Sequence, residues 1–138
     1  MKIKLEAKIE NLDKLIFFCK NFLTSEISPD YNNNLFIVAV EEIFTNISSY
    51  AFGNEIGCAE LELIRTNENM IKATFMDRGY PFNPIEFDSN SRAKENIDKL
   101  VSGGLGLYIV KSTMKNLKYE NVGGCNIFSF ETEVEENK

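Results

Sequence analysis

The chain of 138 residues contains no histidine. This absence excludes Ser–His–Asp hydrolysis, Cys–His proteolysis and every zinc site with a histidine ligand. It also excludes a histidine autokinase that acts on its own chain. Acid–base chemistry in this protein must therefore use Glu, Asp, Lys, Tyr or Cys.

Cysteine and long apolar runs are scarce as well. The three cysteines, Cys19, Cys58 and Cys125, are far apart and have no CxxC spacing. We therefore expect them to be reduced core residues of a cytoplasmic protein. The longest apolar run, LFIVAV, is far shorter than a membrane span, and the amino terminus MKIKLEAKIE lacks the apolar region of a signal peptide.

Acidic residues outnumber basic ones: the chain has 15 Lys and Arg and 21 Asp and Glu, which gives a net charge of −6. This balance disfavours nonspecific binding to nucleic acid or anionic membranes, so we expect neither as a direct partner. The 43% hydrophobic and 26% charged residues are typical of an ordinary soluble globular protein. The length fits one domain over residues 1–138.

Hydrophobic periodicity predicts five strands and three helices. The predicted strands are 2–9, 58–65, 70–77, 117–121 and 125–134, and the predicted helices are 11–27, about 29–52 and 105–117. The polar segment at about 86–103 has few apolar residues and is predicted to be a mobile loop, and the acidic tail at about 133–138 is expected to fray. This order predicts an α+β two-layer sandwich, with helices on one face of a mainly antiparallel (mixed) sheet.

The second predicted helix combines an apolar ridge with polar side chains beside it. The ridge consists of Phe36, Val40, Ile43, Ile47 and Ala51. Glu42 and Asn46 are four residues apart and project to one side at the edge of the core, whereas Glu41 points towards the flank of the helix. The pair is either a surface Glu–Asn contact, worth a few tenths of a kcal/mol, or part of a site.

Asp77 ends a predicted strand within MDRGYPFNP, and Gly79 allows close backbone approach. An aspartate in this position suits the acceptance of a hydrogen bond from an exocyclic amine. The alternative is an ordinary Asp-x-Gly turn.

The stretch GGLGLYIVKSTM, residues 103–114, opens the third helix. It is not a P-loop, because no Gly-x4-Gly-Lys-Ser/Thr occurs in the chain. It is not the dinucleotide fingerprint either, because position 109 is Ile and no strand precedes the glycines. What remains is either a flexible joint or a set of free backbone N–H groups at a helix start, which can bind an anion.

The order and spacing of these three motifs are more specific than any one of them. A Glu-x3-Asn helix, an Asp-x-Gly after a strand and a polar loop that ends in GGLG resemble the GHKL (Bergerat-fold) ATPases. Within this superfamily the chain most closely resembles the bacterial anti-sigma-factor serine/threonine kinases, over about residues 8–130.

The resemblance implies a role for each matched position. Asn46 matches the Mg²⁺ ligand, Glu42 the general base, and Asp77 the acceptor of the adenine amine, with Gly79 beside it. The residues Gly104, Leu105, Gly106 and Leu107 match the segment whose backbone amides hold the phosphates of ATP. The loop 86–103 matches the mobile lid over ATP. Mg²⁺ needs few protein ligands where phosphates and waters complete its octahedron.

The chain also departs from the family pattern. Tyr50 replaces the histidine common near the end of the second helix, and Cys125–Asn126 stand where many relatives place a small hydroxyl residue near the adenine. For the lid residue that meets the γ-phosphate, Arg92, Lys94 and Lys99 are candidates, but each of them is better explained as a solvated loop charge than as a catalytic residue.

The resemblance implies a protein kinase that regulates transcription by partner switching. Its partners would be a sigma factor and a small anti-anti-sigma (STAS-like) protein that carries the phosphorylated serine or threonine, and a homodimer is possible. The main alternative is a non-catalytic ATP-binding adaptor whose partner binding depends on nucleotide state. The ATP-binding half of a sensor histidine kinase is disfavoured, because the chain has no phospho-accepting histidine.

Overall fold

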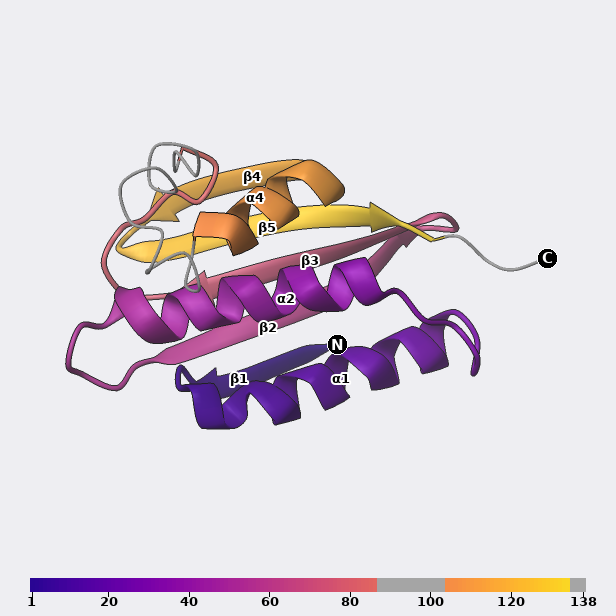
Figure 1. Cartoon of the computed structure of the whole chain (residues 1–138), viewed down its shortest axis with the longest axis horizontal. Coiled ribbons are helices and arrows are strands. Elements are labelled where there is room, and N and C mark those ends of the chain that lie inside the picture. The colour runs from indigo at the N-terminus through magenta and orange to yellow at the C-terminus, as the bar shows by residue number, and fades with distance from the viewer. Residues whose placement is uncertain (87–103, 135–138) are drawn as a thin grey trace.

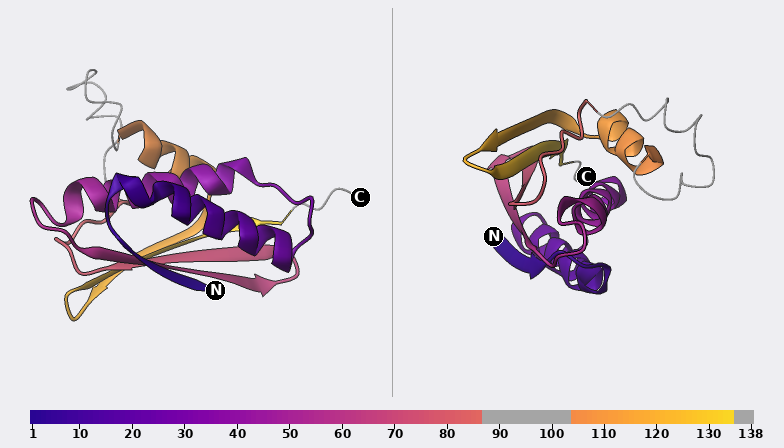
Figure 2. Two further views of the ribbon diagram at one scale, coloured as in Figure 1. Left: turned by 90° about the horizontal axis from the view of Figure 1, so that it is seen from below. Right: turned by 90° about the vertical axis from the view of Figure 1, so that its left-hand side faces the viewer.

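The computed structural model describes residues 1–86 and 104–134, and these residues form two layers. Figure 1 shows the order of the elements, and Figure 2 shows the α-helices together on one face of the sheet, with no described element on the other face. The helical elements are η1 (Ile9–Asn11), α1 (Leu12–Glu26), α2 (Asn34–Asn46), the π-helix η2 (Ile47–Ala51) and α4 (Gly104–Thr113). The strands are β1 (Lys2–Glu6), β2 (Cys58–Asn67), β3 (Met70–Asp77), β4 (Lys115–Val122) and β5 (Cys125–Glu133).

The five strands form one sheet in the order β1-β2-β3-β5-β4. All four strand pairings are antiparallel, so the α+β two-layer class is confirmed, while the sheet of the described residues is not mixed. Tight turns join β2 to β3 and β4 to β5, and such turns can only connect antiparallel strands. The register between β3 and β5 places Asp77 opposite Asn126.

The core lies between the sheet and α2, which runs across the middle of the helical layer (Figure 1). Alternate residues of the central strands β3 and β5 point into it, as period-two strands require. The predicted ridge of α2 is confirmed, because all five of its members are buried: Phe36, Val40, Ile43, Ile47 and Ala51. This packing fixes which face of α2 is turned towards the sheet.

The predicted start of the second helix was wrong. Pro29 and Asp30 form a turn, and the N–H of Tyr31 donates to the carbonyl of Ser28. α2 begins only at Asn34, because the side chain of Asn33 accepts a hydrogen bond from the N–H of Phe36 (3.1 Å) and caps the helix. The predicted end near residue 52 is confirmed, because the π-helix η2 extends α2 to Ala51.

Other boundaries differ by a few residues. β1 ends at Glu6 rather than at residue 9, because its carbonyl accepts a hydrogen bond from the side chain of Asn11 at the start of α1. α4 ends at Thr113 rather than at residue 117, and β4 begins directly afterwards, with Asn116 in the left-handed region (φ 53°).

The cysteine prediction was partly wrong. Cys19 is fully buried, but Cys58 is exposed and Cys125 is only partly buried. Cys58 lies opposite Glu6 on β1, and both side chains belong to the uncovered face of the sheet. Burial raises the pKa of the Cys19 thiol to about 12, and nearby Glu41 adds to the shift.

Two predictions concern residues that the structure does not describe. The proposed lid at 86–103, apart from Glu86, and the last residues of the acidic tail, 135–138, lie beyond the described ranges. Among the helices of residues 1–86 and 104–134, none has the length and apolar character needed to cross a membrane.

Candidate functional site

A cavity of about 190 Å³ lies beside the C-terminal half of α2, between that helix and the neighbouring ends of β3 and β5. Its polar lining includes Asn46, Asp77 and Asn126. Its apolar and aromatic lining consists of Ile43, Ile47, Tyr50, Ala51, Phe75, Tyr80, Pro81, Phe82, Pro84, Tyr119 and Phe128. The volume lies below the roughly 300–1,000 Å³ of sites that enclose a whole drug-sized ligand, so the cavity suits one flat ring system.

Asp77 is the last residue of β3, and its side chain is only 8% exposed. One carboxylate oxygen, Oδ1, accepts hydrogen bonds from the backbone N–H of Gly79 (2.9 Å) and from the amide of Asn126 (3.0 Å). The other oxygen, Oδ2, has no hydrogen-bond partner in the described part of the chain. Oδ2 is not among the fully buried polar atoms of the described residues, so a donor that enters the cavity can reach it.

Gly79 is required by a close backbone contact. A Cβ at this position would lie 2.3 Å from the carbonyl oxygen of Ala51, which no side chain tolerates. The next residue, Tyr80, donates its N–H to the same carbonyl (2.7 Å). Gly79 therefore lets the chain after β3 cross directly against the end of α2 and close one side of the cavity.

Asn46 lies on α2, and its side chain is 7% exposed. Its amide group donates to the carbonyl of Glu42 (2.9 Å), which fixes the amide orientation because only Nδ2 can donate. The amide oxygen, Oδ1, has no hydrogen-bond partner within residues 1–86 and 104–134. An amide oxygen of this kind is a suitable ligand for Mg²⁺.

Glu42 lies one turn before Asn46 and contacts the predicted glycine segment. A Cβ on Gly106 would lie 1.7 Å from Oε2 of Glu42, so α4 packs against this carboxylate only because residue 106 has no side chain. Burial raises the pKa of the Glu42 carboxyl, and the neighbouring Glu41 raises it further.

The remaining predicted residues lie at the start of α4. Gly104 is its first helical residue, and the side chains at positions 104 and 105 lie outside the described set. Leu107 is 1% exposed and belongs to the core, so only its backbone can contact a ligand. Arg92, Lys94 and Lys99 lie outside the described residues.

The structure thus brings Asp77 and Asn46 together in one cavity and brings Gly106 against Glu42 one turn away on α2. Neither Glu42 nor the glycine segment lines the cavity itself. Three polar groups therefore follow one another along α2: the carboxylate of Asp77 at its C-terminal end, then the amide oxygen of Asn46, then the carboxylate of Glu42 against the start of α4.

Sequence reasoning missed the part of the site contributed by the β4–β5 hairpin. The sequence motifs include Asn126 only as a departure from a family pattern, and none of them includes Tyr119. The signal that could have found Asn126 is the period of two in β5, counted forward from the turn at residues 123–124, and Tyr119 then follows from its pairing with Phe128 in the hairpin. This period places Asn126 on the same face as Phe128 and Phe130, which are buried.

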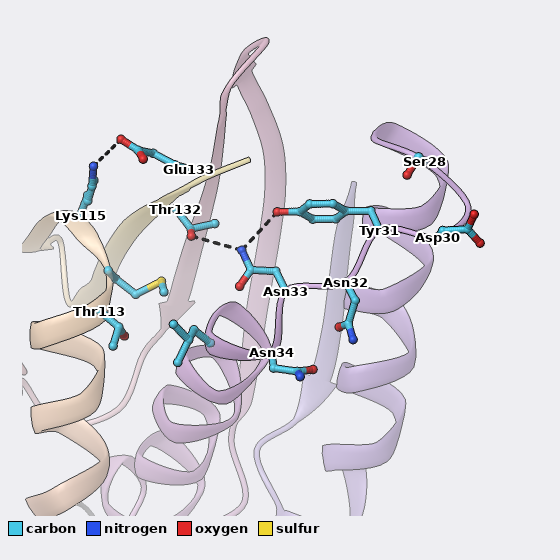
Figure 3. Close-up of a pocket in the computed structure, with 12 residues that line it drawn as sticks. Ser28, Asp30, Tyr31, Asn32, Asn33, Asn34, Thr113, Lys115, Thr132 and Glu133 are labelled. Carbon is cyan, nitrogen blue, oxygen red and sulfur yellow. Dashed lines mark hydrogen bonds and ion pairs between the residues drawn. The ribbon is translucent and has the colours of Figure 1, made fainter. Parts of the chain in front are cut away.

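A larger cavity, of about 850 Å³, lies at the opposite ends of α2 and β5. Figure 3 shows that some of its polar side chains pair with one another, while others, such as Asp30 and Asn34, do not pair with the side chains drawn. The amide of Asn33 donates to the hydroxyls of Tyr31 (3.3 Å) and Thr132 (3.4 Å), and Lys115 forms an ion pair with Glu133. This cavity contains none of the predicted site residues.

The comparisons with known proteins agree with this geometry. The family model of the histidine kinase-like ATPase domain matches residues 5–131. No curated protein matches the chain. The chain belongs to the histidine kinase-like ATPase domain family of the GHKL superfamily, and it is an ATP-binding domain of this type.

Proposed function

We propose that this protein is an anti-sigma regulatory factor that acts as a serine/threonine kinase. Its substrate would be a small anti-anti-sigma (STAS-like) protein, and its second partner a sigma factor, in a cytoplasmic partner-switching pathway. One observation carries the proposal. Two buried side chains with a free acceptor atom, Asp77 and Asn46, line the same cavity, and the partly buried carboxylate of Glu42 lies one turn further along α2.

The binding role follows from the chemistry of the two free acceptors. Oδ2 of Asp77 can accept a hydrogen bond from the exocyclic amine of adenine, while the apolar walls of the cavity pack on its ring. Oδ1 of Asn46 can ligate Mg²⁺, and the backbone at the start of α4 can donate N–H groups to phosphate oxygens. Bound Mg–ATP would supply the phosphoryl group, with its negative charge partly neutralised by the metal.

The catalytic role falls to Glu42. A general base works best when its pKa lies near the working pH, and burial moves the pKa of Glu42 upward from the usual carboxyl value. In the proposed reaction, a serine or threonine oxygen of the partner forms a bond to the γ-phosphorus. The bond between that phosphorus and ADP breaks, and Glu42 accepts the proton of the hydroxyl.

One observation favours a second candidate, the non-catalytic adaptor. In this conformation the backbone of Gly106 lies directly against the carboxylate of Glu42, which restricts approach to that group from the side of α4. The start of α4 must move relative to α2 before a hydroxyl can reach Glu42 from that side. An adaptor needs no such movement for its partner to respond to bound nucleotide.

Radiolabelled ATP, purified protein and a candidate anti-anti-sigma partner test the proposal. We expect Mg²⁺-dependent label on a serine or threonine of the partner, detected by phosphoamino-acid analysis. Asn46→Ala should abolish this label and weaken nucleotide binding in Mg²⁺ but change it little in EDTA. Wild-type protein that binds ATP and the partner and yet leaves the partner unlabelled supports the adaptor instead.

A further inference from the structure

Asn126 holds together three parts of the cavity wall. Its side chain is 6% exposed and lies on β5 opposite Asp77 of β3. The Nδ2 group donates to Oδ1 of Asp77 (3.0 Å) and also approaches the carbonyls of Tyr80 (3.1 Å) and Gly79 (3.2 Å). One amide therefore connects the end of β3, the segment that follows it and β5.

The orientation of this amide is determined by its surroundings. Its oxygen, Oδ1, accepts from the hydroxyl of Tyr119 (2.5 Å) and from the side-chain amide of Asn121 (3.0 Å). A flipped amide would turn its oxygen towards three acceptors and lose both donors on the other side. Nδ2 therefore points to Asp77, and Tyr119 and Asn121 hold it there from behind.

This arrangement limits what Asp77 can accept. Two donors, the N–H of Gly79 and Nδ2 of Asn126, converge on Oδ1, so the carboxylate cannot rotate without breaking both hydrogen bonds. Oδ2 is then the one carboxylate oxygen left for a ligand, at a fixed place beside the cavity. A ring that presents an N–H₂ group fits this acceptor, whereas a ring that presents a carbonyl oxygen at the same position is repelled by it.

We propose that Asn126, held by Tyr119, is the positioning residue that gives this site its preference for a 6-amino over a 6-oxo purine. The inference rests on the proposed nucleotide binding and deepens it. Asp77 makes the contact with the base, and Asn126 keeps Asp77 in the only orientation that discriminates. A residue with this role affects the choice between bases more than the affinity for the phosphates that all nucleotides share.

The test compares ATP with inosine triphosphate, which carries an oxygen in place of the 6-amino group. Both affinities are measured by calorimetry in Mg²⁺. For the wild type we expect ATP to bind about 10- to 100-fold more tightly, the scale of one hydrogen bond to a charged group. In Asn126→Leu, which is similar in size but has no donor, the ratio should fall to within about threefold of unity, while the affinity for inosine triphosphate changes little.

Further variants separate positioning from structural support. In an Asp77→Asn background, adding Asn126→Leu should not lower the ratio again, because the two side chains act as one unit. Tyr119→Phe removes only the hydroxyl behind the amide and should lower the ratio part of the way. Asn121→Ala removes the longer of the two donor bonds and should lower the ratio less than Tyr119→Phe does. Lys118→Ala, exposed on β4 in the same hairpin, is the control, and we expect a change below about twofold.

The outcomes distinguish a positioning role of Asn126 from a structural role, and both from the absence of nucleotide binding. Loss of both affinities in Asn126→Leu with an unchanged ratio assigns Asn126 a structural role and overturns the inference. If Asn126→Leu does not fold, an unchanged ratio in folded Tyr119→Phe overturns it equally. A wild type that binds ATP without discriminating also overturns it. A wild type that binds neither nucleotide overturns the proposed function, and the inference with it.

Discussion

The two ends of α2 carry two very different cavities. At the N-terminal end a cavity of about 850 Å³ is lined by polar side chains that either bond to one another, as Asn33 does with Thr132, or are exposed to solvent, as Asp30 and Asn34 are. Beside the C-terminal half a cavity of about 190 Å³ contains two buried polar side chains, each with a free acceptor atom. Volume alone would select the first.

The difference favours the smaller cavity as the binding site. A polar atom that is paired inside the fold gains little from a ligand, whereas an accessible acceptor without a protein partner can take a hydrogen bond from one. The π-helix η2 belongs to the smaller cavity too, since Ile47, Tyr50 and Ala51 line it, and π-helical turns are frequent at functional sites. The predictions below compare the two ends directly.

The largest difference should appear in the transfer reaction. Glu42→Gln removes the proposed base, so phosphorylation of the partner should fall by ~100-fold or more while ATP still binds. Asn34→Ala, at the exposed rim of the larger cavity, should leave the rate unchanged. Single-turnover transfer at saturating ATP measures both variants. An equal loss in the two variants would remove the distinction between the ends of α2.

Nucleotide affinity should separate the two ends by a smaller factor. In Asp77→Asn the amide oxygen must face the two donors at Gly79 and Asn126, so an NH₂ group replaces the free acceptor Oδ2. We therefore expect ATP affinity to fall by about 10- to 100-fold. Calorimetric titration with ATP and Mg²⁺ measures this loss, again beside Asn34→Ala as the control. If Asp77→Asn binds ATP as tightly as the wild type, the smaller cavity does not hold the base.

Thermal stability should respond to the contact between α4 and Glu42. Gly106→Ala introduces a Cβ where Oε2 of Glu42 now lies, so either the helix or the carboxylate must move. We expect a loss of about 1–3 kcal/mol, seen as a melting temperature lower by roughly 3–10 °C. Ser112→Ala, on the exposed side of the same helix, is the control and should melt within about 1–2 °C of the wild type.

The smallest effect concerns pH. The pKa of Glu42 is raised in the fold, so the folded state binds its proton more tightly than the unfolded state does. Stability from this group is therefore greatest below its ordinary pKa of 4.5 and is lost as pH rises through the raised value. Glu42→Gln should melt slightly above the wild type at pH 7, and the gap should narrow as the pH falls towards 4.5. A constant gap across this range would contradict a raised pKa of Glu42.

Local patterns were enough to predict most of the fold. Alternation identified β2 and β3 and their hairpin, and the apolar ridge from Phe36 to Ala51 identified the face of α2 that meets the sheet. The start of α2 was missed, because Asn33 caps it in competition with Pro29, and a proline followed by an aspartate is an equally good helix start by sequence. The exposure of Cys58 was missed because it depends on which face of the sheet the helices cover.

For the site, spacing along one helix identified Glu42 and Asn46, because residues four apart share a side of the helix. A strand end followed by glycine identified Asp77. The sequence could not reveal that the backbone of Gly106 lies against Glu42, or that the backbone of Gly79 lies against the carbonyl of Ala51. Each contact joins residues far apart along the chain. Asn126 was missed as a partner of Asp77 for the same reason.

The sequence by itself determined the class of the fold, the lack of histidine chemistry and the residue types that can hold a nucleotide and a cation. These follow from composition and from periods of two and 3.6, which depend only on neighbours along the chain. The tertiary structure alone decided which acceptors remain free. The antiparallel pairing of β3 with β5 sets Asn126 against one oxygen of Asp77, and the other oxygen stays open only because no other described side chain reaches it.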